Sequence, residues 1–262
     1  MILSKRVSLN GAQLDELDER IVITGIDEAA GKDSISAVGM AEGDGQRITN
    51  MKRESLDVTV HFRLLIRKED LSARSALLET VNGWASNGGW LRLNYKPGRR
   101  ILVALSQAPG GGDQWNWTNE FSIVFRAYSV PYWEDENETI AVSSVLSGGA
   151  VYLTVPGNTK TVLSLEAANK SGMDINNLRI VTGGQQIQYA GLALRGNQTL
   201  TIDYVQTQKL FVLRNRIGST SVMAARMSIS DDEFIVSPGR INVQWAADRA
   251  IQLTVRCRGR YL

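Results

Sequence analysis

The amino-acid sequence predicts an all-β protein that carries one amphipathic helix and is divided into two domains. Two segments, residues 55–66 and 120–128, alternate between apolar and polar residues, as a strand with one buried face does. Residues 71–85 instead place apolar residues at helical spacing. Beyond residues 134–138 the chain turns to short apolar segments separated by Gly, Asn or Pro, which is typical of a β-sandwich.

The first predicted domain spans residues 1–135 and combines strands with the helix. Asp70 stands directly before the helix, where a side-chain cap is favoured, and the run Asn87-Gly-Gly89 ends it. Three further strands are expected, two of them joined by a turn containing Pro and Gly, at residues 20–26, 89–95 and 99–106.

Residues 27–50 show no sustained periodicity, and we expect a long irregular loop there. A structureless loop of about twenty residues inside a compact domain is uncommon and is usually functional or disordered. Its charges have both signs, which suits contact with another subunit. The candidate interface residues are Asp27, Glu28, Lys32, Asp33, Glu42, Asp44 and Arg47.

The second predicted domain spans residues 136–262. We expect the segment 131–133, which contains a Pro and two aromatic residues, to be packed, and the acidic run after it to be exposed. Short strands are expected at residues 151–155, 161–167, 178–181, 200–205, 210–214, 241–245 and 251–257. The last of these contains Cys257 and leads to Arg256, Arg258 and Arg260, which share one face at period 2 and read as a solvated face.

Composition excludes several classes of function. The 262 residues are 43% hydrophobic and 21% charged with a net charge of +2, so the chain is globular and lacks the basic stripe of a nucleic-acid binder. No apolar run approaches the roughly 20 residues that span a bilayer, so we expect no membrane insertion. The first residues lack the apolar core of a secretory signal, and we expect synthesis and folding in a cytoplasm.

Catalytic chemistry is not expected. The sequence holds one histidine, His61, on the polar face of a predicted strand, and one cysteine, Cys257, in another. A zinc site of the usual kind cannot be made from these two residues, and no motif singles out a pair of carboxylates. We therefore predict a protein that is not an enzyme and has no cofactor. Trp115 and Trp117 could stack on a sugar or mark an interface, or form a same-face pair in a strand.

Several of these segments together resemble the distal tail protein family of siphophages, also called phage tail family proteins. The resemblance lies in the order and spacing of six pieces: the strand at 56–66, the helix after residue 70, the block 90–106, the strand and Pro-aromatic junction at 121–135, residues 234–243 and the ending 253–262. It covers nearly the whole chain, and residues 27–50 are its weakest stretch.

The resemblance implies a belt domain similar to tail-tube proteins, followed by a galectin-like β-sandwich. The belt domain would close a homohexameric ring, and ring closure requires one surface patch to meet a different patch on the next copy. Such a ring, at the virion tail tip, would join the tail tube protein to the tail-tip (tail-associated) protein and support receptor-binding proteins. Tape measure and DNA would pass through its channel without sequence-specific binding.

Three other functions remain to be weighed against this one. A carbohydrate-binding adhesin would use the second domain, although a galectin-like shape does not by itself imply sugar binding. A tail-tube protein would stack into long tubes instead of stopping at rings. A phage-associated hydrolase is disfavoured because the sequence offers no catalytic constellation.

Overall fold

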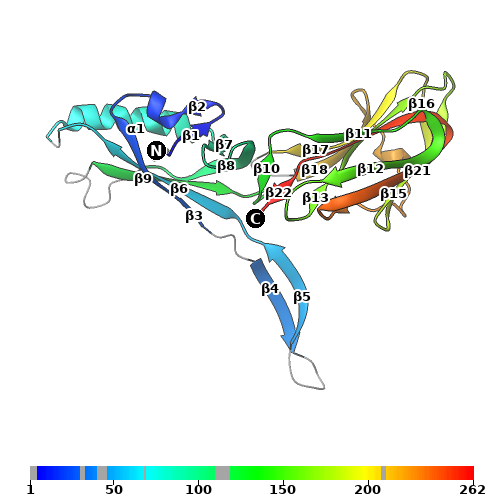
Figure 1. The fold of residues 1–262 in the computed structure, drawn as a ribbon, viewed down its shortest axis with the longest axis horizontal. Helices are drawn as coiled ribbons and strands as arrows, with labels where there is room; N and C mark the ends of the chain where they lie inside the picture. The colour runs from blue at the N-terminus through cyan, green and yellow to red at the C-terminus, as the bar shows by residue number, and fades with distance from the viewer. Residues whose placement is uncertain (1–4, 30–32, 40–45, 68, 110–118, 208–210) are drawn as a thin grey trace. The chain divides into compact units, whose positions relative to one another are not determined.

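The computed structural model of the chain describes residues 5–29, 33–39, 46–67, 69–109, 119–207 and 211–262 (Figure 1). It divides into two units, the first formed by residues 1–133 with 207–209 and the second by 134–206 with 210–262. Strands dominate both units, and α1 (Leu71–Ser86) is the one α-helix of the described residues. The predicted fold class, all-β with one helix, is confirmed.

The first unit is built on a sheet in which the strands follow the order β2-β1-β7-β8-β9-β6-β3. All neighbours in this order are antiparallel. In chain order the elements are β1 (Val7–Leu9), β2 (Ala12–Gln13), the 3-10 helix η1 (Leu14–Glu16), β3 (Ile21–Glu28), β6 (Leu56–Leu64), β7 (Gly89–Leu93), β8 (Arg99–Gln107) and β9 (Glu120–Ala127).

One face of this sheet forms the core with α1. Alternate residues of β6 and β9 are buried, as the sequence pattern predicts. The helix contributes apolar residues at helical spacing, and its Trp84 ring meets the Phe125 ring edge-on, with 5.8 Å between the ring centroids. The Asp70 side chain accepts a hydrogen bond from the Ala73 N–H at 2.9 Å, which confirms the predicted N-cap.

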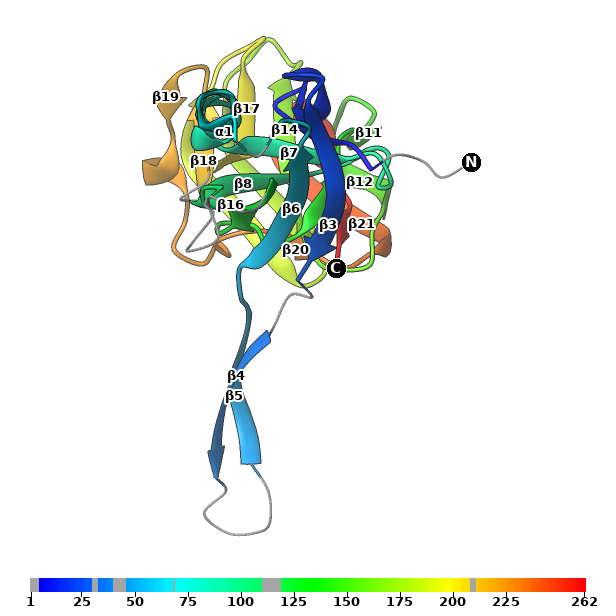
Figure 2. The ribbon, with the colours of Figure 1, turned by 90° about the vertical axis from the view of Figure 1, so that its left-hand side faces the viewer.

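The expectation of an irregular loop at residues 27–50 is wrong. β3 continues to Glu28, and β4 (Asp33–Gly39) and β5 (Gln46–Arg53) then pair as an antiparallel hairpin. Both views show this hairpin projecting from the sheet of the first unit (Figures 1 and 2). The sequence pattern is weak here because β4 alternates small residues, Ser with Ile and Ala, and because a bulge at Ser36/Ala37 breaks the pairing register.

In the second unit one long strand, β21 (Gly239–Cys257), organises the β-sandwich. Its first half pairs with β12 and β15, and its second half pairs with β11 and β14, so β21 runs through both layers. The remaining elements are β10 (Trp133–Asp135), β11 (Thr139–Val142), β12 (Leu146–Val155), β13 (Thr161–Val162), β14 (Ser164–Asn169), β15 (Ile175–Thr182), β16 (Gln185–Leu194), β17 (Thr199–Gln206), β18 (Phe211–Ile217), β19 (Thr220–Ser221), η3 (Met223–Ala225), β20 (Ile235–Val236) and β22 (Arg260–Tyr261).

Three strand predictions in this unit need correction. Segments 241–245 and 251–257 are one strand of 19 residues, β16 was not predicted, and segment 161–167 is divided between β13 and β14. The polar run around Asp248 interrupts the apolar alternation of β21. The Asp248 carboxylate accepts hydrogen bonds from the main-chain N–H groups of Asn176 and Asn177, at 3.1 and 3.2 Å. The polar run is therefore a contact to β15 and not a loop.

The residues after the Pro-aromatic segment also differ from expectation. Trp133 is buried as predicted, but Glu134, expected to be exposed, is buried as well. It lies 3.0 Å from Arg260, which is buried too and lies over the Phe211 ring. Arg260 therefore does not belong to the solvated face expected for Arg256 and Arg258. The cause is the pairing of β10 with β22, which brings the two charges together.

Candidate functional site

The second face of β3, β6 and β9 is polar and uncovered by α1. It carries the residues that alternate with the buried ones of β6 and β9, and an antiparallel sheet with one solvated face has this composition. β3 ends the strand order, so within that order it has a neighbour on one side only. A long edge strand is a natural place for another chain to pair.

Charged residues on this face are matched across the strands. Asp57 and Arg126 are register partners, and the Arg126 guanidinium donates to both carboxylate oxygens at 2.5 and 2.7 Å. The Asp57 carboxylate raises the pKa of Arg126 still further above its usual range. Arg63 and Glu120 form a second such pair at the other end of β6 and β9. The face therefore presents paired charges and no single-sign field.

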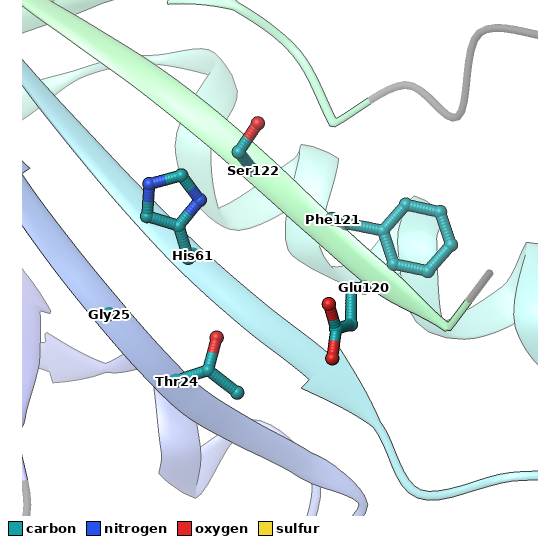
Figure 3. A pocket seen from close by; sticks show the side chains of 6 residues that line it. All are labelled: Thr24, Gly25, His61, Glu120, Phe121 and Ser122. Atoms are coloured by element: carbon teal, nitrogen blue, oxygen red, sulfur yellow. The ribbon is translucent and has the colours of Figure 1, made fainter. Parts of the chain in front are cut away.

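A hollow of about 360 Å³ lies between these pairs, and Figure 3 shows the side chains around it. His61 projects into it and its Nε2 lies 2.9 Å from Asp27 Oδ2 on β3. The hollow is lined by Thr24, Gly25, His61, Glu120, Phe121 and Ser122. Hydroxyl, imidazole and carboxylate groups surround it, so it suits hydrogen bonding to polar groups of a partner.

The structure brings Ser122, His61 and Asp27 onto one face, a grouping that sequence reasoning missed because the residues are far apart in the chain. Ser122 is the cross-strand register partner of His61. The imidazole nitrogen that is hydrogen-bonded faces Asp27, and among the described residues no hydrogen bond joins Ser122 to His61. The geometry is a hydrogen-bonded surface pair and not a nucleophile held by its base.

The hairpin of β4 and β5 is the second candidate surface. The Arg53 guanidinium lies 3.4 Å from the Asp33 carboxylate at its root, and Ile35 is 55% exposed. Among the described strands β4 and β5 pair only with each other, and an isolated two-stranded hairpin is marginal in water. We therefore expect this hairpin to gain stability from contact with another surface.

The predicted interface residues are distributed over three places. Asp27 lies on the polar face, Glu28 points to the interior side of the first unit, and Asp33 lies at the hairpin root. Arg47 is opposite Val38 in the hairpin register. Lys32, Glu42 and Asp44 lie outside the described residues, as do Trp115 and Trp117.

Glu28 is the centre of a polar cluster that the sequence did not predict. Its Oε1 accepts from the Tyr95 hydroxyl at 2.9 Å. Its Oε2 accepts from Lys96 Nζ at 2.6 Å and from Trp133 Nε1 at 2.9 Å. The Lys96 ammonium also lies 4.6 Å from the centre of the Trp133 ring. Burial, followed by the bond to Glu28, raises the pKa of Tyr95 well above its usual range.

In the described ranges no three His, Cys, Asp or Glu side chains gather as a metal site requires. No helix of the described part of the chain is long and apolar enough to cross a membrane. Cys257 lies in a strand, β21, as the sequence predicts; its side chain is buried, and burial raises the pKa of its thiol to about 11. In the second unit a polar hollow of about 460 Å³ lies beside β17 and β18.

Comparisons with known proteins gave matches among solved structures alone. No family model matches the chain, and no curated protein does. The Dit protein (gp 19.1) of phage SPP1, described as a paradigm of the hub adsorption apparatus in phages that infect Gram-positive bacteria, matches with a TM-score of 0.71. That match covers 98% of this chain and 99% of the SPP1 chain at 12% sequence identity.

Two chains from the phage P2 baseplate match less well. In the activated conformation with Ca the TM-score is 0.46 at 6% identity, covering 97% of this chain and 98% of the other. With Sr it is 0.45 at 6% identity, covering 97% of each chain. The SPP1 match extends over both units, and at 12% identity it concerns the fold. The chain thus has the fold of SPP1 Dit, which confirms, at the level of the fold, the resemblance to distal tail proteins found in its sequence.

Proposed function

We propose that this chain is a structural protein of a siphophage tail tip, a distal tail protein of which six copies form a ring. The observation that carries the proposal is the fold match to SPP1 Dit, which covers 98% of this chain and 99% of that one. Agreement over both units is more specific than agreement over one common domain.

The first unit offers two candidate patches for a ring. A ring is built from two different patches, one on each side of every copy. The free edge of β3 is one candidate patch and the projecting hairpin another. We assign the hairpin to contact with the neighbouring copy, with Asp27, Asp33 and Arg47 near that contact.

The polar face of β3, β6 and β9 would then line a channel, because α1 covers the opposite face. Its arginines Arg63 and Arg126 are each matched by a carboxylate. A surface of paired charges offers few free cations to phosphate groups, whose binding depends on unmatched Lys and Arg. Such a channel wall suits the passage of tape measure and DNA without retention.

The proposed partners follow from this position. The ring would join the tail tube protein to the tail-tip (tail-associated) protein in the virion and support receptor-binding proteins. The chain would act without a cofactor and would not be an enzyme, since the polar face holds hydrogen-bonded pairs instead of an activated nucleophile.

Electron microscopy of the purified protein tests the proposal. Negatively stained particles should be six-fold rings with a central hole, and light scattering should give the mass of one ring or of two rings back to back. A glycan array should give no binding, which separates this function from an adhesin. A protein that stays monomeric at all concentrations, or that stacks into long tubes, would contradict the proposed ring.

A further inference from the structure

Glu28 lies at the start of the hairpin root and also contacts Trp133, the last residue of the first unit before the second unit begins. It is the last residue of β3, directly before the segment that leads into the hairpin. The next main-chain N–H, that of Ala29, donates to the Asp57 carbonyl at 3.0 Å, and this is the last described bond before the hairpin. The hairpin joins the sheet at two places, from β3 through Glu28 and Ala29 and from β5 directly into β6. Glu28 and Ala29 thus hold one of these two connections.

The other end of the cluster is the last residue of the first unit. Trp133 is 1% exposed, and its indole N–H donates to the Glu28 carboxylate. Glu134, the next residue, begins the second unit and pairs there with Arg260. Trp133 and Glu134 are thus held by contacts within different units, and the contact that holds Trp133 is its hydrogen bond to Glu28.

The Glu28 carboxylate is held on both of its oxygens. One carboxylate receives three donors, and one of these, Lys96, is charged. Hydrogen bonds to ionised groups are roughly twice as strong as neutral ones. The side chains of Lys96 and Glu28 are 23% and 22% exposed, so water screens this pair less than it screens a surface pair.

We propose that Glu28 is a positioning residue that couples the hairpin root to Trp133, so that docking of the hairpin on a second copy of the chain stiffens the start of the second unit. The inference rests on the proposed function for the docking step. The coupling itself is a property of the single chain. By linkage, a coupling between two places acts equally in both directions.

Hydrogen exchange measured by mass spectrometry tests the coupling in the full chain. The readouts are the Ala29 N–H at the hairpin root and the Asp135 N–H, which donates to the Gly259 carbonyl at 3.0 Å. Glu28→Gln should make exchange at Asp135 about tenfold faster, the scale of one lost charge-assisted hydrogen bond. Trp133→Phe keeps an aromatic ring but removes the indole N–H donor, and should speed exchange at Ala29 by a similar factor.

The matched control is Asp27→Asn, one residue earlier on the same strand. Asp27 points to the polar face, its side chain is 78% exposed, and it contacts His61 instead of the cluster. This variant should leave exchange at Asp135 unchanged. If Glu28→Gln speeds exchange only around Tyr95 and Lys96, or if Trp133→Phe leaves Ala29 unchanged, the coupling is wrong.

Assembly gives a separate readout on the same samples. In the wild type, exchange at Asp135 should slow as rings form, and in Glu28→Gln it should stay insensitive to ring formation. Light scattering reports the rings independently. Absence of rings in the wild type overturns the proposed function, whereas rings that form without slowing exchange at Asp135 overturn the coupling alone.

Discussion

Cys257 offers a specific report on the second unit. It is the one cysteine of the sequence, it is 4% exposed, and it lies among the apolar residues of the sandwich core. Burial, followed by the charges of Asp135 and Glu138, raises the pKa of its thiol to about 11, above its ordinary value of 9.0. Because the thiolate is the reactive form, the folded protein resists thiol reagents for two reasons: the thiol is buried, and its raised pKa keeps it protonated.

We predict that a thiol reagent labels Cys257 only when the second unit opens. The thiol has a higher pKa in the folded than in the unfolded state, so its contribution to stability is complete below about pH 9 and is lost as the pH rises towards about 11. Comparing the urea midpoints of wild type and Cys257→Ala between pH 8 and pH 11 measures this pH-dependent contribution of the thiol to stability. An equal decline in both proteins would contradict it.

The pair of Arg260 and Glu134 is the next residue-scale test. Its side chains are 10% and 5% exposed, and removal of one partner from a buried pair typically costs about 3–5 kcal/mol. Arg260→Ala should therefore destabilise the second unit by about that amount, measured from the urea dependence of Cys257 labelling. The control is Arg256→Ala, whose pair with Glu166 is 35% and 33% exposed and should cost about 0–1 kcal/mol.

Single residues were predicted well where their neighbours are close in sequence. The Asp70 cap and the position of His61 on a polar face both follow from local patterns. The Glu28 cluster does not, because its three donors lie 67, 68 and 105 residues away. A carboxylate at a strand end looks the same in sequence whether it faces solvent or a buried indole.

Elements were predicted where one face is buried and the period is regular. β6, β9 and α1 each have such a face, and all were expected. The hairpin was missed because β4 alternates small residues with apolar ones and because a bulge at Ser36/Ala37 shifts its register. β21 was divided because its contact through Asp248 looks like a turn.

Deletion of the hairpin tests its assignment to subunit contact. The Ala29 N–H already donates to the Asp57 carbonyl at 3.0 Å, so a short Asn-Gly turn can replace residues 30–55 without moving β3 or β6. We expect the variant to fold and to remain monomeric, since the core of the first unit is untouched. Circular dichroism checks the fold and light scattering the mass.

A matched control keeps the hairpin and changes its root pair. Arg53→Gln removes the 3.4 Å ion pair with Asp33, in which the Arg53 and Asp33 side chains are 15% and 45% exposed. Because the carboxylate is exposed, we expect a cost of about 1 kcal/mol. This variant should still assemble. Normal rings from the deletion variant would show that the hairpin is not the contact and would move the assignment to the edge of β3.

At the scale of the whole molecule, the change in sequence pattern beyond residues 134–138 predicted two domains. We propose different roles for their two cores. The first unit has the free strand edge, the hairpin and the polar face. The second has a closed apolar core organised by β21. We therefore predict that residues 1–133 contain all that ring formation needs.

Separate expression of residues 1–133 and 134–262 tests this division. The first fragment should form rings, and the second should be a folded monomer by light scattering. The second fragment must begin at Glu134, because a version starting at residue 139 loses the carboxylate that pairs with the buried Arg260 guanidinium. That shorter version should unfold at lower urea, by the same Cys257 labelling assay, although its core residues are unchanged. Rings formed by residues 134–262 alone would reverse the assignment, because assembly would then belong to the sandwich and the hairpin would need another partner.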